Sequence, residues 1–86
     1  MILPTIHSGG TSRDALIRDY DAAARAFKDF VDAWQAIDFN GRDYYRQGPG
    51  AWDTAVDERY EHTQALDKLC DYLTEIRTHL HKQPQP

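Results

Sequence analysis

The chain contains no long apolar run, only one cysteine and no concentrated basic segment, and each absence excludes a class of protein. No apolar stretch approaches the roughly 18 residues that a membrane-spanning helix needs. Residues 1–6 are too short for the core of a signal peptide and lack a basic start. Cys70 has no second cysteine, which excludes an internal disulfide and an all-cysteine metal site. We therefore expect a cytoplasmic protein that has no membrane partner.

The balance of charge argues against nucleic acid as a partner. The formal net charge is −4, and ten basic residues are scattered among fourteen acidic ones. Non-specific binding to nucleic acid depends on neutralising phosphates, which requires a basic field that this chain lacks. An acidic protein can mimic DNA, but solubility explains this charge equally well. No nucleic-acid partner is expected.

What the chain does contain is a pair of apolar heptad repeats. Apolar residues separated alternately by three and four positions return to one edge of a helix. The first repeat consists of Leu16, Tyr20, Ala23, Phe27, Phe30, Trp34 and Ile37. The second consists of Trp52, Ala55, Arg59, His62, Leu66, Leu69, Leu73, Ile76 and Leu80. The repeats predict an all-α fold, an antiparallel two-helix hairpin of the coiled-coil type.

Helix-breaking residues divide this single domain, 1–86, into segments. Gly9-Gly10 favours an extended lead-in, and Thr11 or Ser12 can cap the first helix. Asn40-Gly41 is typical of a left-handed stop just past a helix. The expected ranges are 1–11 for the lead-in, 12–38 for the first helix, 39–50 for the loop, 51–81 for the second helix and 82–86 for the tail.

The side chains also predict how the two helices are aligned. Antiparallel helices pair residues whose numbers have a constant sum, and a sum of 89 places every residue of the first repeat against one of the second. In this register Trp34 faces Ala55, the large-against-small contact that a packed core favours. Shifts of one heptad, about 10 Å, satisfy the repeats equally well. Side-chain volume therefore selects the register.

Arg59 and His62 are two polar residues within the second repeat. The register places Arg59 across Phe30 and His62 across Phe27, where polar groups can fix the alignment at a cost in stability. Glu58 and His62 also have a spacing that can hold a metal. The first helix, however, contains no glutamate for a di-iron site. No metal or other cofactor is expected.

A lone hairpin leaves apolar residues beside each repeat without cover. They are Ile17, Ala24 and Val31 on the first helix and Val56, Tyr60 and Cys70 on the second. The lead-in, the loop or a second copy can supply the burial that so small a domain needs. We expect completion by dimerisation into a four-helix bundle or by a stable partner protein.

Aromatic and arginine side chains gather in and beside the loop. The candidate partner-binding residues are Arg42, Tyr44, Tyr45, Arg46, Gln47 and Trp52. Tyr, Trp and Arg dominate the energetics of protein interfaces. The loop tyrosines can equally pack over the open end of the hairpin and bury Phe39, or divide the two roles between them. Both interpretations stay open.

Catalytic motifs are not recognisable in this sequence. Ser8 and Ser12 lie beside a glycine pair and at a helix cap. We find no phosphate-binding loop, nucleophile elbow or paired buried carboxylates, and a helical hairpin offers no obvious ligand-sized pocket. No catalytic residue and no enzymatic activity are expected.

Two short motifs resemble those of a known family. Residues 6–16 read IHSGGTSRDAL, and residues 40–45 read NGRDYY, with QGP at 47–49. Together they resemble small proteins of tailed phages and prophages, in which a Gly-Thr-Ser start and an Arg-Asp-Tyr-Tyr loop precede two long helices. Gly9 and Arg46 stand where that pattern favours Asn and Pro. The resemblance implies a phage or prophage origin and a host bacterial cell, but no activity or ligand.

We therefore expect a small accessory protein that acts by protein–protein binding and inhibits or redirects a host factor or defence complex. The alternative is a structural or assembly component of a phage particle, in which the hairpin packs against copies of itself. A second alternative is a metal-binding or enzymatic helical dimer built on Glu58 and His62.

Overall fold

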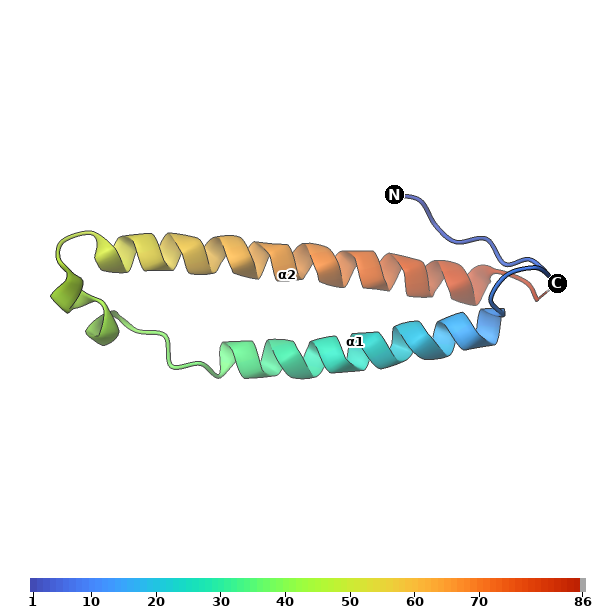
Figure 1. The fold of residues 1–86 in the computed structure, drawn as a ribbon, viewed down its shortest axis with the longest axis horizontal. Coiled ribbons are helices and arrows are strands. Elements are labelled where there is room, and N and C mark those ends of the chain that lie inside the picture. The colour runs from blue at the N-terminus through green and yellow to red at the C-terminus, as the bar shows by residue number, and fades with distance from the viewer. Residues whose placement is uncertain (86) are drawn as a thin grey trace.

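A computed structural model describes residues 1–85 as two long antiparallel helices joined by a loop (Figure 1). Helix α1 spans Arg13–Gln35 and helix α2 spans Ala51–Lys82. No strand occurs within the described part of the chain. The predicted all-α hairpin is therefore confirmed. Pro86, which belongs to the predicted tail, lies outside the described residues.

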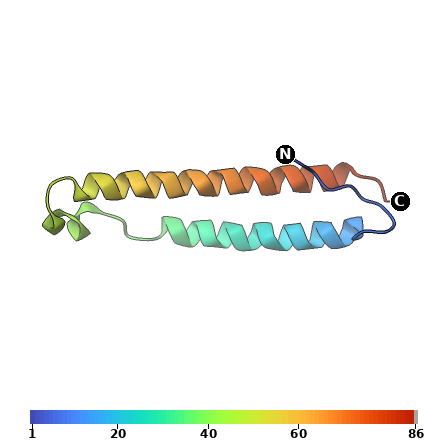
Figure 2. The same cartoon turned by 45° about the horizontal axis from the view of Figure 1, so that its top comes forward.

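The two helices form a thin rod. The molecule measures 61 × 22 × 18 Å and has a radius of gyration of 18.9 Å, whereas a compact chain of this length has one of about 12 Å. α1 and α2 lie side by side in both views, with the loop at one end and both termini at the other (Figures 1 and 2). We call these the loop end and the terminal end.

Helix α1 begins at a side-chain cap and ends earlier than the sequence predicts. The Ala15 N–H donates to Ser12 Oγ at 3.1 Å, so Ser12, and not Thr11, is the N-cap. The helix ends at Gln35, short of the predicted end at residue 38. The chain then continues through an irregular stretch into the loop.

The loop contains two short 3-10 turns. Asn40 is extended, with φ at −150°, and its Oδ1 accepts from the Arg42 N–H at 2.9 Å. This bond caps the first turn, η1 (Gly41–Asp43), and the second turn, η2 (Tyr45–Gln47), follows it. The left-handed stop predicted at Asn40-Gly41 is therefore wrong. The asparagine side chain caps the next turn instead of ending α1.

The predicted register is also wrong. The Trp34 Nε1–H donates to Thr63 Oγ1 at 3.3 Å, so Trp34 lies against Thr63 and not against Ala55. Near the terminal end, Arg77 Nε donates to Asp21 Oδ1 at 2.8 Å. The residue numbers of these two pairs sum to 97 and 98, whereas Arg59 with Trp34 and Arg13 with Leu80 each sum to 93. The helix α2 is therefore displaced from the predicted sum of 89 by between four and nine residues, roughly 6 to 13 Å. A half-buried indole N–H needs an acceptor, and in this alignment Thr63 provides it.

The buried face of α1 differs from the predicted repeat as well. Phe30 and Ile37 belong to that repeat but are 50% and 51% exposed. The strip beside the repeat takes their place: the half-buried residues of α1 include Ile17, Tyr20, Ala24, Phe27, Val31 and Trp34. These residues keep the heptad spacing. The edge of α1 that faces α2 is therefore a neighbouring edge of the helix and not the predicted one.

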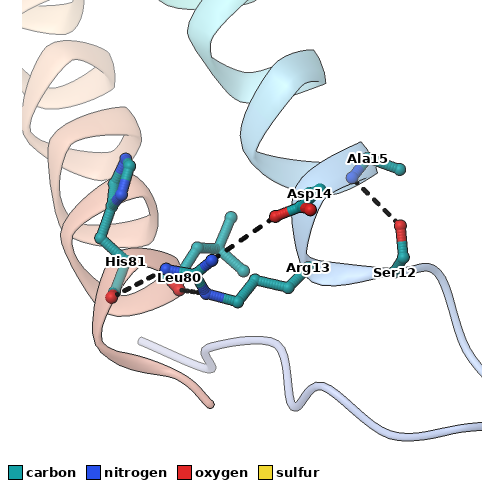
Figure 3. Close-up of polar contacts among 6 residues, drawn as sticks. All are labelled: Ser12, Arg13, Asp14, Ala15, Leu80 and His81. Atoms are coloured by element: carbon teal, nitrogen blue, oxygen red, sulfur yellow. Dashed lines mark hydrogen bonds and ion pairs between the residues drawn. The ribbon is translucent and has the colours of Figure 1, made fainter. Parts of the chain in front are cut away.

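An arginine of each helix caps the C-terminus of the other helix. At the terminal end, Arg13 Nε donates to Leu80 O at 3.0 Å and its Nη2 donates to His81 O at 3.1 Å (Figure 3). Toward the loop end, Arg59 Nη2 donates to Trp34 O at 2.7 Å. Carbonyls in the last turn of a helix lack partners within the helix, and a positive charge there also stabilises the helix dipole. These contacts fix both ends of the hairpin.

The core of the molecule lies at the terminal end. Ile76 and Leu80 of α2 are 1% and 0% exposed, and they are the only fully buried side chains among residues 1–85. The lead-in runs back beside this part of α2, as Figure 1 shows, and His79 Nε2 donates to Pro4 O at 2.7 Å. Leu3 and Ile6 of the lead-in are half-buried. Burial is therefore complete only where a third layer covers the hairpin.

Candidate protein-binding surfaces

Three aromatic rings close the loop end of the hairpin. The ring centroids of Phe39 and Trp52 are 4.9 Å apart, and Tyr44 lies 5.8 Å from Phe39 and 5.6 Å from Trp52. The Arg59 guanidinium lies 5.0 Å from the Phe39 ring centroid and 3.9 Å from that of Trp34. Such contacts add to the stability gained from buried area. Tyr44 and Trp52 therefore contribute to the packing of the loop end.

Two glycines direct the chain from the loop into α2. Gly48 and Gly50 have φ angles of 109° and 86°, a region that glycine adopts without steric cost. Gly50 immediately precedes α2, so the sharp turn places Trp52 in the first turn of the helix, within reach of the loop. The Gly48 N–H also donates to Tyr45 O at 3.4 Å, which closes the adjacent 3-10 turn, η2.

The other predicted loop residues face the solvent. Tyr45 is 65% exposed, and Arg42, Arg46 and Gln47 are exposed beside it in the sequence. Arg42 forms a surface ion pair with Asp38 at 3.2 Å. A shallow depression next to Tyr45 is lined by Tyr45, Gly48, Pro49, Gly50, Trp52 and Asp53. We call the four exposed residues, Arg42, Tyr45, Arg46 and Gln47, the loop surface.

The two polar residues of the second repeat, Arg59 and His62, lie in different environments. Arg59 is half-buried and caps α1, as described above, so it lies against Trp34 and not against Phe30. His62 is exposed, and its predicted place across Phe27 is wrong. Glu58 is exposed too. Within residues 1–85, no group of three or more His, Cys, Asp or Glu side chains is arranged to hold a metal ion.

A long groove between α1 and α2 is the feature that the sequence interpretation missed. It has a volume of about 600 Å³ and runs along the middle of the hairpin. Its apolar lining consists of Ala24, Phe27, Val31, Trp34, Leu66, Cys70 and Leu73. Polar side chains form its rims: Lys28 and Gln35 from α1, and Arg59, Thr63, Asp67, Thr74 and Arg77 from α2. The uncovered strip that contains Ala24 and Val31 was the signal in the sequence.

The exposed surface of the chain is large for its mass. The chain exposes 6,540 Å², and its mass is 9.9 kDa. A compact protein of that mass exposes about 5,200 Å², so about 1,300 Å² is in excess. Large apolar side chains outside the groove, such as Tyr60 and Leu69, are 64% and 44% exposed as well. The hairpin therefore leaves much apolar surface in water.

Similarity to known proteins adds nothing to this interpretation. No family model matches the chain, and no curated protein and no solved structure is significantly similar to it. No helix in residues 1–85 has both the length and the apolar character needed to cross a membrane.

Proposed function

We propose that this protein acts by binding other proteins and not by catalysis. The uncovered groove is the observation that carries the proposal. An apolar groove between two helices, bounded by polar rims, is a surface that another polypeptide can cover. With Ile76 and Leu80 as the only fully buried side chains in residues 1–85, the hairpin also gains stability from such a contact.

The groove and the loop surface have separate roles in this proposal. The groove is the site at which another chain completes the hairpin, either a second copy in a four-helix bundle or a partner protein. The loop surface lies at the end of the rod and lines no part of the groove. Its tyrosine and arginines therefore stay available to a further partner after the groove is covered.

The further partner is a host protein in our proposal. The sequence motifs that resemble phage and prophage proteins support an accessory protein in the cytoplasm of a bacterial host, which inhibits or redirects a host factor. The alternative is an assembly component that binds only copies of itself. Exposure of the loop surface outside the groove favours the first function, because self-association through the groove leaves Tyr45 and Arg46 without a role.

The double variant Tyr45→Ala with Arg46→Ala tests this proposal. Both side chains are exposed, so we expect helicity to be unchanged and the free energy of unfolding to change by less than about 0.5 kcal/mol. A protein that the natural chain retains from an extract of its bacterial host is expected to be lost by the variant. Circular dichroism and affinity capture measure the two effects.

Tyr60→Ala is a matched control, because Tyr60 is 64% exposed and Tyr45 is 65% exposed. The control is expected to keep the captured protein. Equal capture by the double variant and the natural chain would contradict a binding role for the loop surface. So would melting of the double variant, which would make these side chains part of the packing.

A further inference from the structure

We infer that a second copy of this chain occupies the groove, in a homodimer whose two-fold axis runs along the length of the hairpin. The inference deepens the proposed function, because it rests on the claim that another chain completes the hairpin. It identifies that chain and the way in which the two hairpins face each other. Three observations support it.

The first observation is that no other segment within residues 1–85 lies in the groove. The lead-in lies beside α2 at the terminal end, where Pro4 O accepts from His79, and none of its residues lines the groove. The loop is held at the opposite end by the contacts of Tyr44 with Phe39 and Trp52. Both segments that could cover the groove within one chain are therefore engaged elsewhere.

The second observation is the amount of surface that remains to be covered. The excess over a compact protein, about 1,300 Å² for one chain of 9.9 kDa, exceeds the roughly 800 Å² that each partner buries in a standard stable interface. Interfaces of obligate homodimers are larger and more apolar than that standard. This excess belongs to the whole rod, so a second hairpin that lies along the full length of the first can bury the area that a stable homodimer requires.

The third observation is that the groove is complementary to itself in charge. Lys28 stands on the α1 rim and Asp67 on the α2 rim. Both lie between the same two cross-helix contacts, Trp34 with Thr63 and Asp21 with Arg77, and so at a similar level of the hairpin. They form no ion pair with each other within residues 1–85.

Lys28 pairs with Asp32 of α1 at 3.2 Å, but both side chains are mostly exposed, so this pair is weak and Lys28 can meet a carboxylate of a second copy. Arg59 and Arg77 of α2 also line the groove, but they are engaged within the chain by the Trp34 carbonyl and Asp21. Lys28 and Asp67 are therefore the charged groove residues that a second copy can match.

A two-fold axis along the hairpin brings these opposite charges together on both rims of the groove. In a symmetric dimer, if residue i meets residue j of the other copy, then j meets i as well. An axis along the hairpin places α1 of one copy over α2 of the other at the same level, so that Lys28 meets the second copy's Asp67 on both rims. An axis across the hairpin places α1 over α1, where Lys28 meets only carboxylates of α1, such as its present partner Asp32, and Asp67 has no lysine of α1 opposite it. The charges therefore favour the first arrangement.

Charge reversal tests the arrangement. Lys28→Glu alone, or Asp67→Lys alone, places like charges together on both rims, and we expect each dimer to dissociate on the order of tenfold more readily. An equimolar mixture of the two variants is expected to recover the affinity of the natural dimer, because every reversed side chain then meets an opposite charge. Sedimentation equilibrium measures the dissociation constants.

Arg25→Glu and Asp71→Lys are matched controls, since both positions are exposed, lie one turn from the tested residues and line no part of the groove. They are expected to leave dissociation unchanged, and circular dichroism checks that all variants stay helical. The arrangement is wrong if neither charge reversal changes the dissociation constant. It is also wrong if the mixture dimerises no more tightly than either variant alone. If the natural chain is monomeric in solution, the inference that a second copy occupies the groove is wrong. The capture experiment with the Tyr45→Ala, Arg46→Ala variant tests the loop surface separately, because its result does not depend on what occupies the groove.

Discussion

The terminal end and the middle of the hairpin have the same heptad spacing but very different burial. At the terminal end, Ile76 and Leu80 are 1% and 0% exposed, and the lead-in lies over this part of α2. In the middle, Val31 and Leu66 point into an open groove and are only half-buried. The difference teaches that two helices in contact do not make a core. A third layer decides which apolar side chains leave water.

Within residues 1–85, that third layer is present at one place only. The lead-in is about ten residues long, so it covers the last turns of α2 and cannot reach the rest of a rod 61 Å long. The groove needs a layer of helical length, which neither the lead-in nor the loop provides. Variants that alter the covered and the uncovered region separately should therefore behave differently.

The largest contrast is expected between Leu80→Ala and Leu66→Ala. Leu80 is fully buried within one chain, so its truncation should lower the free energy of unfolding by about 3 kcal/mol at every protein concentration. Leu66 is half-buried in the lone chain, and its truncation should cost about 1 kcal/mol in dilute solution and more where a second chain covers the groove. Denaturant unfolding at several protein concentrations measures both.

A cost of Leu66→Ala that is the same at all concentrations would remove the distinction between the two regions. Leu80→Ala serves as the internal control in that series, since its cost does not depend on a second chain.

A smaller effect is expected from Arg13→Gln, which sharpens the account of the terminal end. The arginine side chain is 23% exposed and donates to two carbonyls at the C-terminus of α2. Loss of these charged hydrogen bonds should lower the free energy of unfolding by about 1–2 kcal/mol. Arg18→Gln is the control, because Arg18 is exposed and forms no hydrogen bond or ion pair within residues 1–85. Equal losses would mean that Arg13 does not hold the two helices together.

The smallest effect is expected from His62→Leu. The side chain is exposed and lies outside the groove, so the free energy of unfolding should change by less than about 0.5 kcal/mol. Thermal unfolding followed by circular dichroism measures the change. A loss above about 1 kcal/mol would place His62 in a contact between chains, and the uncovered region would then be larger than the groove.

The sequence predicts the two helices well because heptad spacing depends only on local geometry. The regular spacing from Leu16 to Ile37 and from Trp52 to Leu80 requires helices wherever an apolar edge is to be formed. The register is different, since alignments one heptad apart satisfy the repeats equally. Volume favoured Trp34 against Ala55, but the hydrogen bond from Trp34 to Thr63 belongs to another alignment. Repeats alone do not contain that information.

The candidate surfaces were predictable only in part. The composition of the loop identified a cluster of tyrosine, tryptophan and arginine, but it could not tell which rings pack together. The structure divides the two adjacent tyrosines, with Tyr44 against Trp52 and Tyr45 in solvent. The groove depends on the rotation of α1 toward Ala24 and Val31 and on the register, so it could not be derived before both were known.

Cys70 provides the most direct test that the groove is covered, because this single thiol is exposed and lines the groove. The measurement is the rate at which it reacts with a small thiol reagent, over a range of protein concentrations and against the unfolded chain as reference. We expect the rate to approach that of the unfolded chain in dilute solution and to fall as the second copy binds. A rate that stays equally fast at every concentration would contradict the account.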